Sequence, residues 1–179
     1  MNIFLSETQL DKYLMNVYQL KNVIRYNTRN KLKDESVAEH SFYVALFVLK
    51  LCDEYQIDMQ TTFYSLIKAL LHDMPEIELN DITYNVKQRL KLNEFLKSYE
   101  KEYYEKNFQQ YVELMIDDKD TLVNAIVNYA DVLSVRQYCL NELSLGNNSD
   151  DIEEIFKESK HRLNECYKNL EQLMERKQQ

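Results

Sequence analysis

Between Ser36 and Leu51 the chain reads SVAEHSFYVALFVLKL. Its first four residues have the S-x-x-E form of a capping box, in which the Ser36 and Glu39 side chains satisfy backbone N–H groups at a helix start. Apolar residues then follow at the spacing of one helix face as far as Leu51. This pattern predicts a helix over residues 37–55.

The same period of about 3.6 residues recurs along most of the chain, and the breaks carry helix-boundary residues instead of hairpin residues. Asp58 is placed to cap a helix that should end near His72 or Asp73, because Pro75 disfavours helical geometry at the residue before it. Four further helices are expected. The first starts after Ser6 and ends before a loop at 26–33, and the second runs through 96–115. The third runs from 121 to 145, before Gly146 and Asn147, and the fourth carries an apolar seam from 152 to 173.

Glycine and proline each occur once in 179 residues, whereas roughly 7% and 5% are usual in globular proteins. Turn-rich all-β folds are excluded, and with Gly146 as the sole glycine no Gly-rich phosphate loop can be written. We predict an all-α, single-domain helical bundle over residues 1–179, with 152–175 as a terminal packing helix. The apolar seam of that helix should pack on its own bundle or on a second copy, and we favour a homodimer.

The charge balance narrows the choice of partners. The net charge is −8, from 22 basic and 30 acidic residues, with no basic block that could follow a phosphate backbone. We therefore expect no nucleic-acid polymer as partner. No apolar run approaches the length of about 20 residues that a membrane span needs, and we expect a protein that is neither exported nor membrane-spanning. Three widely spaced cysteines, Cys52, Cys139 and Cys166, indicate neither a disulfide framework nor a metal knuckle, which favours the cytoplasm.

Histidine occurs only three times, and His40 and His72 both lie at expected helix ends inside apolar segments. Asp73 follows His72 directly, and Asp131 lies within an apolar run, where an unpaired carboxylate costs several kcal/mol. His40 alone is more often a satisfied helix-start histidine than a ligand. Two imidazoles and two carboxylates that converge, however, form a mixed N/O site for one divalent metal ion. The third histidine, His161, stands in a charged segment, and we expect it at the surface.

In this order, His40, His72-Asp73 and Asp131 resemble the H…HD…D signature of the HD-domain phosphohydrolases. Within that superfamily the sequence most resembles the YfbR-like 5′-deoxynucleotidases. The segments that carry this resemblance are Ile24-Arg25-Tyr26, Glu35 to Ser41, Leu71 to Glu76, Asp81-Ile82-Thr83, Val86-Lys87 and Gly146-Asn147-Asn148. Two departures bear on base and sugar preference: Tyr26 stands where the family usually has Trp, and residues 81–85 replace a Pro-rich D-L-P-T-P.

The resemblance implies that the 5′-phosphate of a deoxyribonucleoside monophosphate, a small-molecule nucleotide, is hydrolysed by a metal-activated water. One divalent ion is implied, with Co, Mn, Mg, Fe and Zn all left open. Arg25 would clamp the phosphate instead of closing a surface ion pair, and either Glu76 or Asp81 would protonate the leaving oxygen. The residues implied as substrate contacts are Arg25, Tyr26, Asp81, Thr83 and Lys87.

Other readings stay open at this point. An HD hydrolase of a cyclic nucleotide, a guanosine polyphosphate or a nucleoside triphosphate would use the same ligands. A triphosphate site should add several Lys or Arg residues near the pocket, and the sequence indicates few. A catalytically silent nucleotide-binding module is disfavoured because all four ligand positions hold competent residues.

Overall fold

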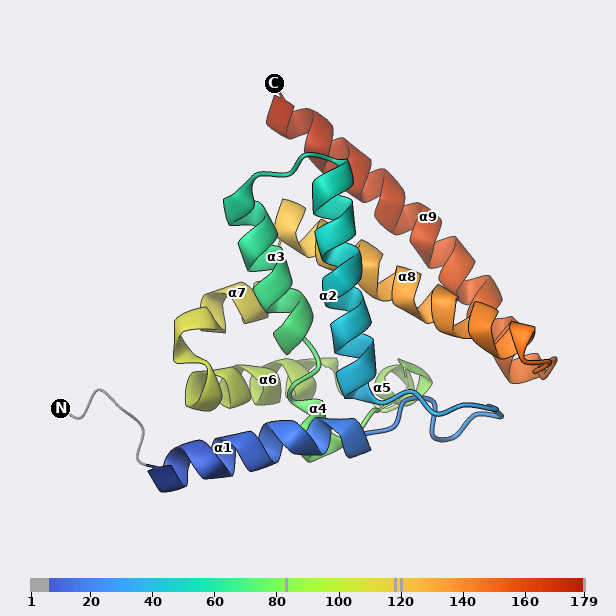
Figure 1. The fold of residues 1–179 in the computed structure, drawn as a ribbon, viewed down its shortest axis with the longest axis horizontal. Helices are drawn as coiled ribbons and strands as arrows, with labels where there is room; N and C mark the ends of the chain where they lie inside the picture. Colours follow the sequence, from blue (N-terminus) through green and yellow to red (C-terminus); the bar gives the residue numbers. More distant parts are fainter. Residues whose placement is uncertain (1–6, 83, 118, 120, 179) are drawn as a thin grey trace.

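A computed structural model describes residues 7–82, 84–117, 119 and 121–178. In these ranges the regular structure is helical, apart from one isolated bridge between Ile24 and Ser36 (Figure 1). The elements are α1 (Glu7–Gln19), η1 (Leu20–Asn22), α2 (Val37–Glu54), α3 (Met59–Leu71), α4 (Glu76–Leu79), α5 (Tyr84–Arg89), α6 (Asn93–Asn107), η2 (Gln109–Tyr111), α7 (Val112–Ile116), α8 (Leu122–Ser144) and α9 (Asp150–Gln178). This architecture confirms the all-α prediction.

Helix α2 starts where the sequence predicts. Ser36 and Glu39 form both hydrogen bonds of the capping box, and the helix ends at Glu54, one residue before the expected end. Val44 and Val48 are fully buried in the core cluster between α2, α3 and α8. Burial of one such side chain contributes about 1.5 to 3 kcal/mol, so α2 is fixed against its neighbours along its inner face.

Helix α8 runs through the middle of the bundle and packs against α2, α3 and α9 (Figure 1). Thr121 caps its start by accepting a hydrogen bond from the Asn124 backbone N–H. Its end is also as predicted, because Gly146 adopts a φ of +93° just after the helix, a conformation that favours glycine. A central helix of this kind can carry a polar side chain into the interior from its middle turns.

The expected helix through residues 96–115 is instead two helices. Phe108 leaves the helical region with φ −142° and ψ 46°, so α6 ends at Asn107 and α7 begins at Val112. The Phe108 ring packs among Tyr103, Tyr104 and other members of a second core cluster. The turn directs α7 onto α3, where burying this aromatic ring outweighs continuing the helix. An apolar period does not reveal such a break.

The terminal helix α9 packs along α8 of its own chain (Figure 1). Ile152 and Leu170 of the predicted seam are fully buried, and Leu173 packs against the main core. The seam is thus covered within the chain, the first of the two expected arrangements, and the homodimer stays a prediction. The expected cap Ser6 lies outside the described residues. Among the described helices, none is long and apolar enough to cross a membrane.

Candidate active site

His40 lies in the first turn of α2, with its side chain 1% exposed. The Ile24–Ser36 bridge ties the segment before the helix to residues 23–25, since Val37 N donates to Val23 O and Arg25 N donates to Glu35 O. This tie brings Arg25 next to the imidazole, where Arg25 Nη1 lies 2.8 Å from His40 Nδ1.

His72 ends α3, and Asp73 follows it directly. The His72 Nδ1–H donates to the Ala69 carbonyl at 2.8 Å, which directs Nε2 away from the helix. The Tyr104 hydroxyl, from α6, donates to the carbonyls of Leu71 and His72 and so fixes the backbone of this helix end. His72 Nε2 lies 3.1 Å from Asp73 Oδ2.

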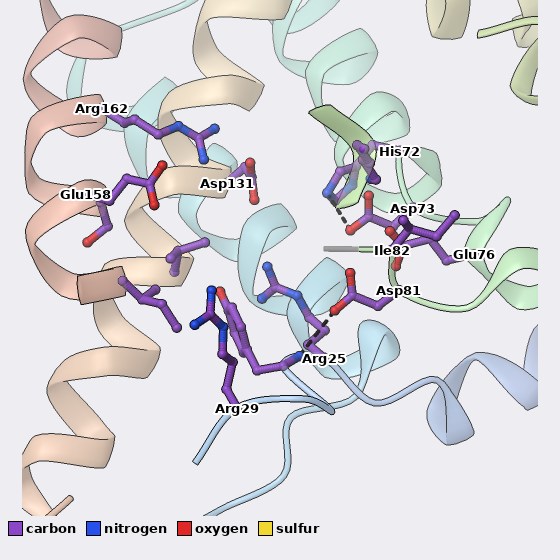
Figure 2. Close-up of a pocket in the computed structure, with 15 residues that line it drawn as sticks. Arg25, Arg29, His72, Asp73, Glu76, Asp81, Ile82, Asp131, Glu158 and Arg162 are labelled. Carbon is purple, nitrogen blue, oxygen red and sulfur yellow. Dashed lines mark hydrogen bonds and ion pairs between the residues drawn. The ribbon is translucent and has the colours of Figure 1, made fainter. Parts of the chain in front are cut away.

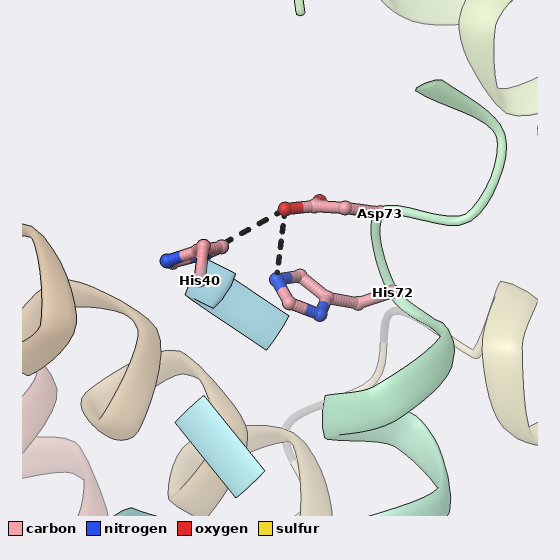
Figure 3. A group of neighbouring side chains, drawn as sticks. All are labelled: His40, His72 and Asp73. Atoms are coloured by element: carbon pink, nitrogen blue, oxygen red, sulfur yellow. Dashed lines mark ion pairs between the residues drawn. The ribbon is translucent and has the colours of Figure 1, made fainter. Parts of the chain in front are cut away.

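The predicted ligands from three separate helical segments come together at one point. Ligand atoms of His40, His72 and Asp73 all lie within 4.8 Å of one another, and the Asp73 carboxylate faces both rings (Figure 3). Asp131, from the middle of α8, is outside that set of three but lies beside it, with Oδ1 3.2 Å from His40 Nε2. Four residues from three elements, separated by up to 91 positions between 40 and 131, thus meet at one cluster.

A metal ion fits this cluster. The Nε2 atoms of His40 and His72 are buried and make no hydrogen bond of acceptable geometry among the described residues, and a buried polar atom without a partner costs about 1 to 3 kcal/mol. His72 Nδ1 donates to a backbone carbonyl, as a metal-ligating histidine usually does, and Ser134 Oγ lies within hydrogen-bond distance of His40 Nδ1. With two adjacent carboxylates, this is the donor set that a borderline divalent ion takes.

The charges in the cluster are strongly coupled. Burial and the Arg25 guanidinium lower the pKa of His40, which keeps that ring neutral. Burial also opposes charge on His72, but the Asp73 carboxylate outweighs it and raises the His72 pKa to about 9. The pKa of Asp73 and of Asp131 is lowered because the neighbouring imidazoles outweigh the cost of burial. Both carboxylates are therefore ionised and able to ligate.

Glu76 opens α4, one turn beyond His72, and faces the same cavity. Burial, together with the nearby charges of Asp73 and Asp81, raises the pKa of Glu76 to about 9. At neutral pH this carboxyl group therefore carries a proton, as a general acid must. Glu78, two residues along the same short helix, is exposed and accepts a hydrogen bond from Tyr99 instead.

The cavity has a volume of about 280 Å³ and opens between α8, α9 and the segments around Arg25 and Asp81. Figure 2 shows His72, Asp73 and Glu76 on one side of it and Glu158 and Arg162 on the other. Its lining comprises Arg25, Tyr26, Arg29, His72, Asp73, Glu76, Asp81, Ile82, Lys87, Asp131, Val135, Ile155, Glu158, Ser159 and Arg162. His40 lies behind this lining, in the wall.

Tyr26 and Asp81 fix the mouth of the cavity to each other. The Tyr26 backbone N–H donates to Asp81 Oδ2 at 3.2 Å, and the Tyr26 ring stacks on Tyr138 of α8 with centroids 4.9 Å apart. Tyr26 has a φ of +54°, which a residue with a side chain adopts at some cost. These contacts hold Tyr26 in that conformation beside Arg25.

A known family accounts for this arrangement. The profile described as 5′-deoxynucleotidase YfbR-like matches residues 12–176, nearly the whole chain. The chain belongs to this family. No curated protein matches it. The resemblance to this family, stated from the H…HD…D order and the surrounding segments, is thereby confirmed.

Solved structures share the fold. An HD-domain phosphohydrolase of Listeria innocua is 21% identical, with 90% of this chain and 82% of that chain covered and a TM-score of 0.74. A protein of Pyrococcus horikoshii is 24% identical, with 92% and 96% covered and a TM-score of 0.74. An HD phosphohydrolase of cyanophage S-2L is 16% identical, with 98% of both chains covered and a TM-score of 0.66. That last structure holds dA and one catalytic Zn²⁺ ion.

Most of the predicted site residues that the structure describes lie at this cluster or its cavity. The four expected ligands converge, and Arg25, Tyr26, Glu76, Asp81 and Lys87 all border on the site or line its cavity. Thr83 lies outside the described residues. His161 is at the surface, as expected, with its side chain 75% exposed.

Sequence reasoning missed the contribution of α9, which was expected only to pack. Four of its residues line the cavity, and they follow the helical spacing of one face: Ile155, Glu158, Ser159 and Arg162. It also missed Ser134, whose Oγ lies 3.1 Å from His40 Nδ1. Because Ser134 follows Asp131 by three residues, it shares a helix face with it, and that spacing was a usable signal.

Proposed function

We propose that this family member removes the 5′-phosphate from deoxyribonucleoside monophosphates with the help of one divalent metal ion. The observation that carries the proposal is the pair of buried Nε2 atoms that form no hydrogen bond among the described residues, next to two carboxylates and a protonated Glu76. Family membership supports the substrate class, and so does the deoxynucleoside in the cyanophage relative.

His40, His72, Asp73 and Asp131 would hold the ion. When bound, it would activate a water as nucleophile and neutralise charge on the phosphoryl oxygens. The protein's own contribution is to hold four donors in place from the rigid ends and middle of packed helices. The two carboxylates are already ionised before an ion enters, whereas His72, whose pKa is raised to about 9, loses its Nε2 proton when the ion binds.

Arg25 would bind the phosphate. Glu35 accepts a hydrogen bond from Arg25 Nη1 at 2.7 Å, and both side chains are largely buried, so the guanidinium has a fixed position at the cavity. Its remaining N–H groups can donate to two phosphoryl oxygens at once. The positive charge of Arg25 also compensates the negative charge that the oxygens share as the ester bond breaks.

Glu76 would protonate the O5′ leaving group. The proton that Glu76 carries at neutral pH passes to O5′ as the P–O bond breaks, and Glu76 becomes a carboxylate. Asp81 is less suited to this step because its Oδ2 already accepts a hydrogen bond from the Tyr26 N–H. A role for Asp81 in positioning the substrate fits that contact better.

The nucleoside would lie along Tyr26, Asp81, Lys87 and, outside the described residues, Thr83. The Tyr26 ring is held by Tyr138 and offers a rigid aromatic surface beside Arg25. Val135 of α8 and Ile155 of α9 also line the cavity and offer apolar surface to a base. Glu158 and Arg162 line the side of the cavity that faces away from His72 and Glu76 (Figure 2).

One observation favours a second candidate, a nucleoside triphosphate. Four Lys or Arg side chains line the cavity, Arg25, Arg29, Lys87 and Arg162, which is more than the sequence indicated. Arg29 is paired with Asp151 and Glu154, whereas Arg162 forms no ion pair with any described residue. Arg162 could therefore receive a further phosphate.

A phosphate-release screen with deoxyribonucleoside and ribonucleoside 5′-monophosphates and triphosphates, in Mn²⁺, Co²⁺, Mg²⁺ and Zn²⁺, decides between these. We expect inorganic phosphate from deoxyribonucleoside monophosphates at the highest kcat/KM. Release of pyrophosphate or triphosphate as the main product would establish the second candidate. If none of these nucleotides is cleaved with any of the ions, both proposals are wrong, and a cyclic nucleotide or a guanosine polyphosphate becomes the next substrate to test.

A further inference from the structure

Two side chains compete for one ring nitrogen of His40. Arg25 Nη1 lies 2.8 Å from His40 Nδ1, and Ser134 Oγ lies 3.1 Å from the same atom. The two neighbours differ in what they can do. A guanidinium can only donate a hydrogen bond, whereas a hydroxyl can donate or accept one.

The contact with Arg25 fixes where the proton of the neutral imidazole resides. Because Arg25 donates, Nδ1 must offer its lone pair, and the ring proton is then on Nε2, 3.2 Å from Asp131 Oδ1. That tautomer cannot ligate a metal through Nε2. A ligating Nε2 needs its lone pair free, which puts the proton on Nδ1. Two donors, Nδ1–H and Nη1–H, would then face each other.

We propose that Ser134 is a positioning residue that accepts the Nδ1 proton of His40 when Nε2 ligates the metal, and that Arg25 releases His40 in the same step. The inference rests on the proposed role of His40 as a ligand. The number of protons on the ring does not change, since one leaves Nε2 and one is gained at Nδ1. Ser134 is 2% exposed, so water does not compete for this hydrogen bond.

The released N–H of Arg25 gains a new use. Glu35 still holds the guanidinium at 2.7 Å, so Arg25 stays at the cavity with one more donor free for a phosphoryl oxygen. Metal loading and phosphate binding should therefore favour each other, and by linkage the effect is reciprocal. The metal-free protein keeps Arg25 occupied with His40, and the loaded protein presents it to substrate.

Nitrogen-15 NMR of histidine-labelled protein tests the tautomer directly, because the chain has only three histidines. We expect the His40 proton on Nε2 without metal and on Nδ1 with Zn²⁺. His72 is the internal control, since its Nδ1–H donates to a backbone carbonyl and should stay in place throughout. In metal-free Arg25→Gln, His40 should already favour the Nδ1–H tautomer. Nδ1–H in the metal-free wild type would overturn the proposal.

Calorimetry with Zn²⁺ tests Ser134. We expect Ser134→Ala to bind Zn²⁺ about 10-fold to 100-fold more weakly and Ser134→Thr, which keeps the hydroxyl, to recover most of the loss. Ser41→Ala is the matched control: Ser41 is also buried in α2 beside His40, and its hydroxyl makes no hydrogen bond to a described residue. Equal affinity of Ser134→Ala and wild type would overturn the role of Ser134.

Titration with inorganic phosphate tests the coupling. Wild-type protein loaded with Zn²⁺ should bind phosphate more tightly than metal-free protein, and phosphate should raise the Zn²⁺ affinity by the same factor. If Ser134→Ala fails to fold, the NMR measurements on wild type and Arg25→Gln still decide the proposal. None of these measurements needs a nucleotide, so failure of the deoxynucleotidase proposal would be seen separately in the phosphate-release screen.

Discussion

Two sides of the cavity are built in different ways. The ligand side consists of His40, His72, Asp73 and Asp131, which project from the long packed helices or from their ends. The substrate side consists of residues 24–36, 76–82 and 84–91, which form loops, one bridge and two short helices. Packing fixes the first side, whereas individual hydrogen bonds and ion pairs fix the second. Changes on each side should therefore have different effects.

The largest effect that leaves the metal in place should come from Glu76. Glu76→Gln removes the proton donor without touching a ligand, so kcat should fall by about 10² to 10⁴ while metal content is unchanged. Glu78→Gln on the same short helix is the control and should behave as wild type. Steady-state phosphate release measures both. If Glu76→Gln keeps the wild-type kcat, Glu76 is not the general acid, and Asp81 becomes the candidate for that role.

Arg25→Ala should be next, with a fall in kcat/KM of about 10² to 10³. KM should rise as well as kcat fall, because Arg25 contacts phosphate both before and during bond breakage. The exposed Arg176 on α9 offers a matched substitution to Ala that should change neither constant. A loss of the same size in Arg176→Ala would show that net charge, not the clamp, is responsible.

The pH dependence of kcat should reveal the titration of Glu76. Its raised pKa means that the active, protonated form prevails at low pH and is lost as pH rises through about 9. A bound cation draws this pKa down, so kcat should fall about tenfold per pH unit from a midpoint at or below about 9. The profile of Glu76→Gln should lack that limb. A wild-type profile that stays flat to pH 10 contradicts the assignment.

The smallest effect concerns how the substrate side is attached to α8. The fully buried Glu142 carboxylate accepts hydrogen bonds from the Leu32 and Lys33 backbone N–H groups and from Asn147. Glu142→Gln leaves one of these donors without an acceptor and should lower the free energy of unfolding by about 1 to 3 kcal/mol.

Urea unfolding, with the exposed Glu113→Gln as control, measures this stability difference. Metal content should be unaffected in both variants, because Glu142 contacts the loop and not the ligands. Equal unfolding midpoints for the two variants would mean that the loop is held by other contacts.

The ligand side could be predicted from the sequence and much of the substrate side could not, for a physical reason. Helix starts and ends are local: the Ser36 capping box, Asp58 and Gly146 lie where the chain indicates. His40, His72 and Asp131 then follow from their places on those helices. The contacts of Glu142 with Leu32 and of Tyr26 with Asp81 join residues 110 and 55 positions apart. No local pattern encodes such pairs.

The break at Phe108 and the α9 face at Glu158 and Arg162 escaped prediction for the same reason. An apolar period shows that a segment is buried but not which neighbour buries it. The helix break at Phe108 and the contact of one α9 face with the cavity both depend on tertiary packing.

The most direct test of the account is the metal content of purified protein after equilibration with Zn²⁺ or Mn²⁺ and removal of free ion. We predict about one ion per chain in wild type and in Glu76→Gln, and sharply lower occupancy in His40→Ala, His72→Ala and Asp131→Ala. Equal metal content in the wild type and in all three ligand variants would contradict it.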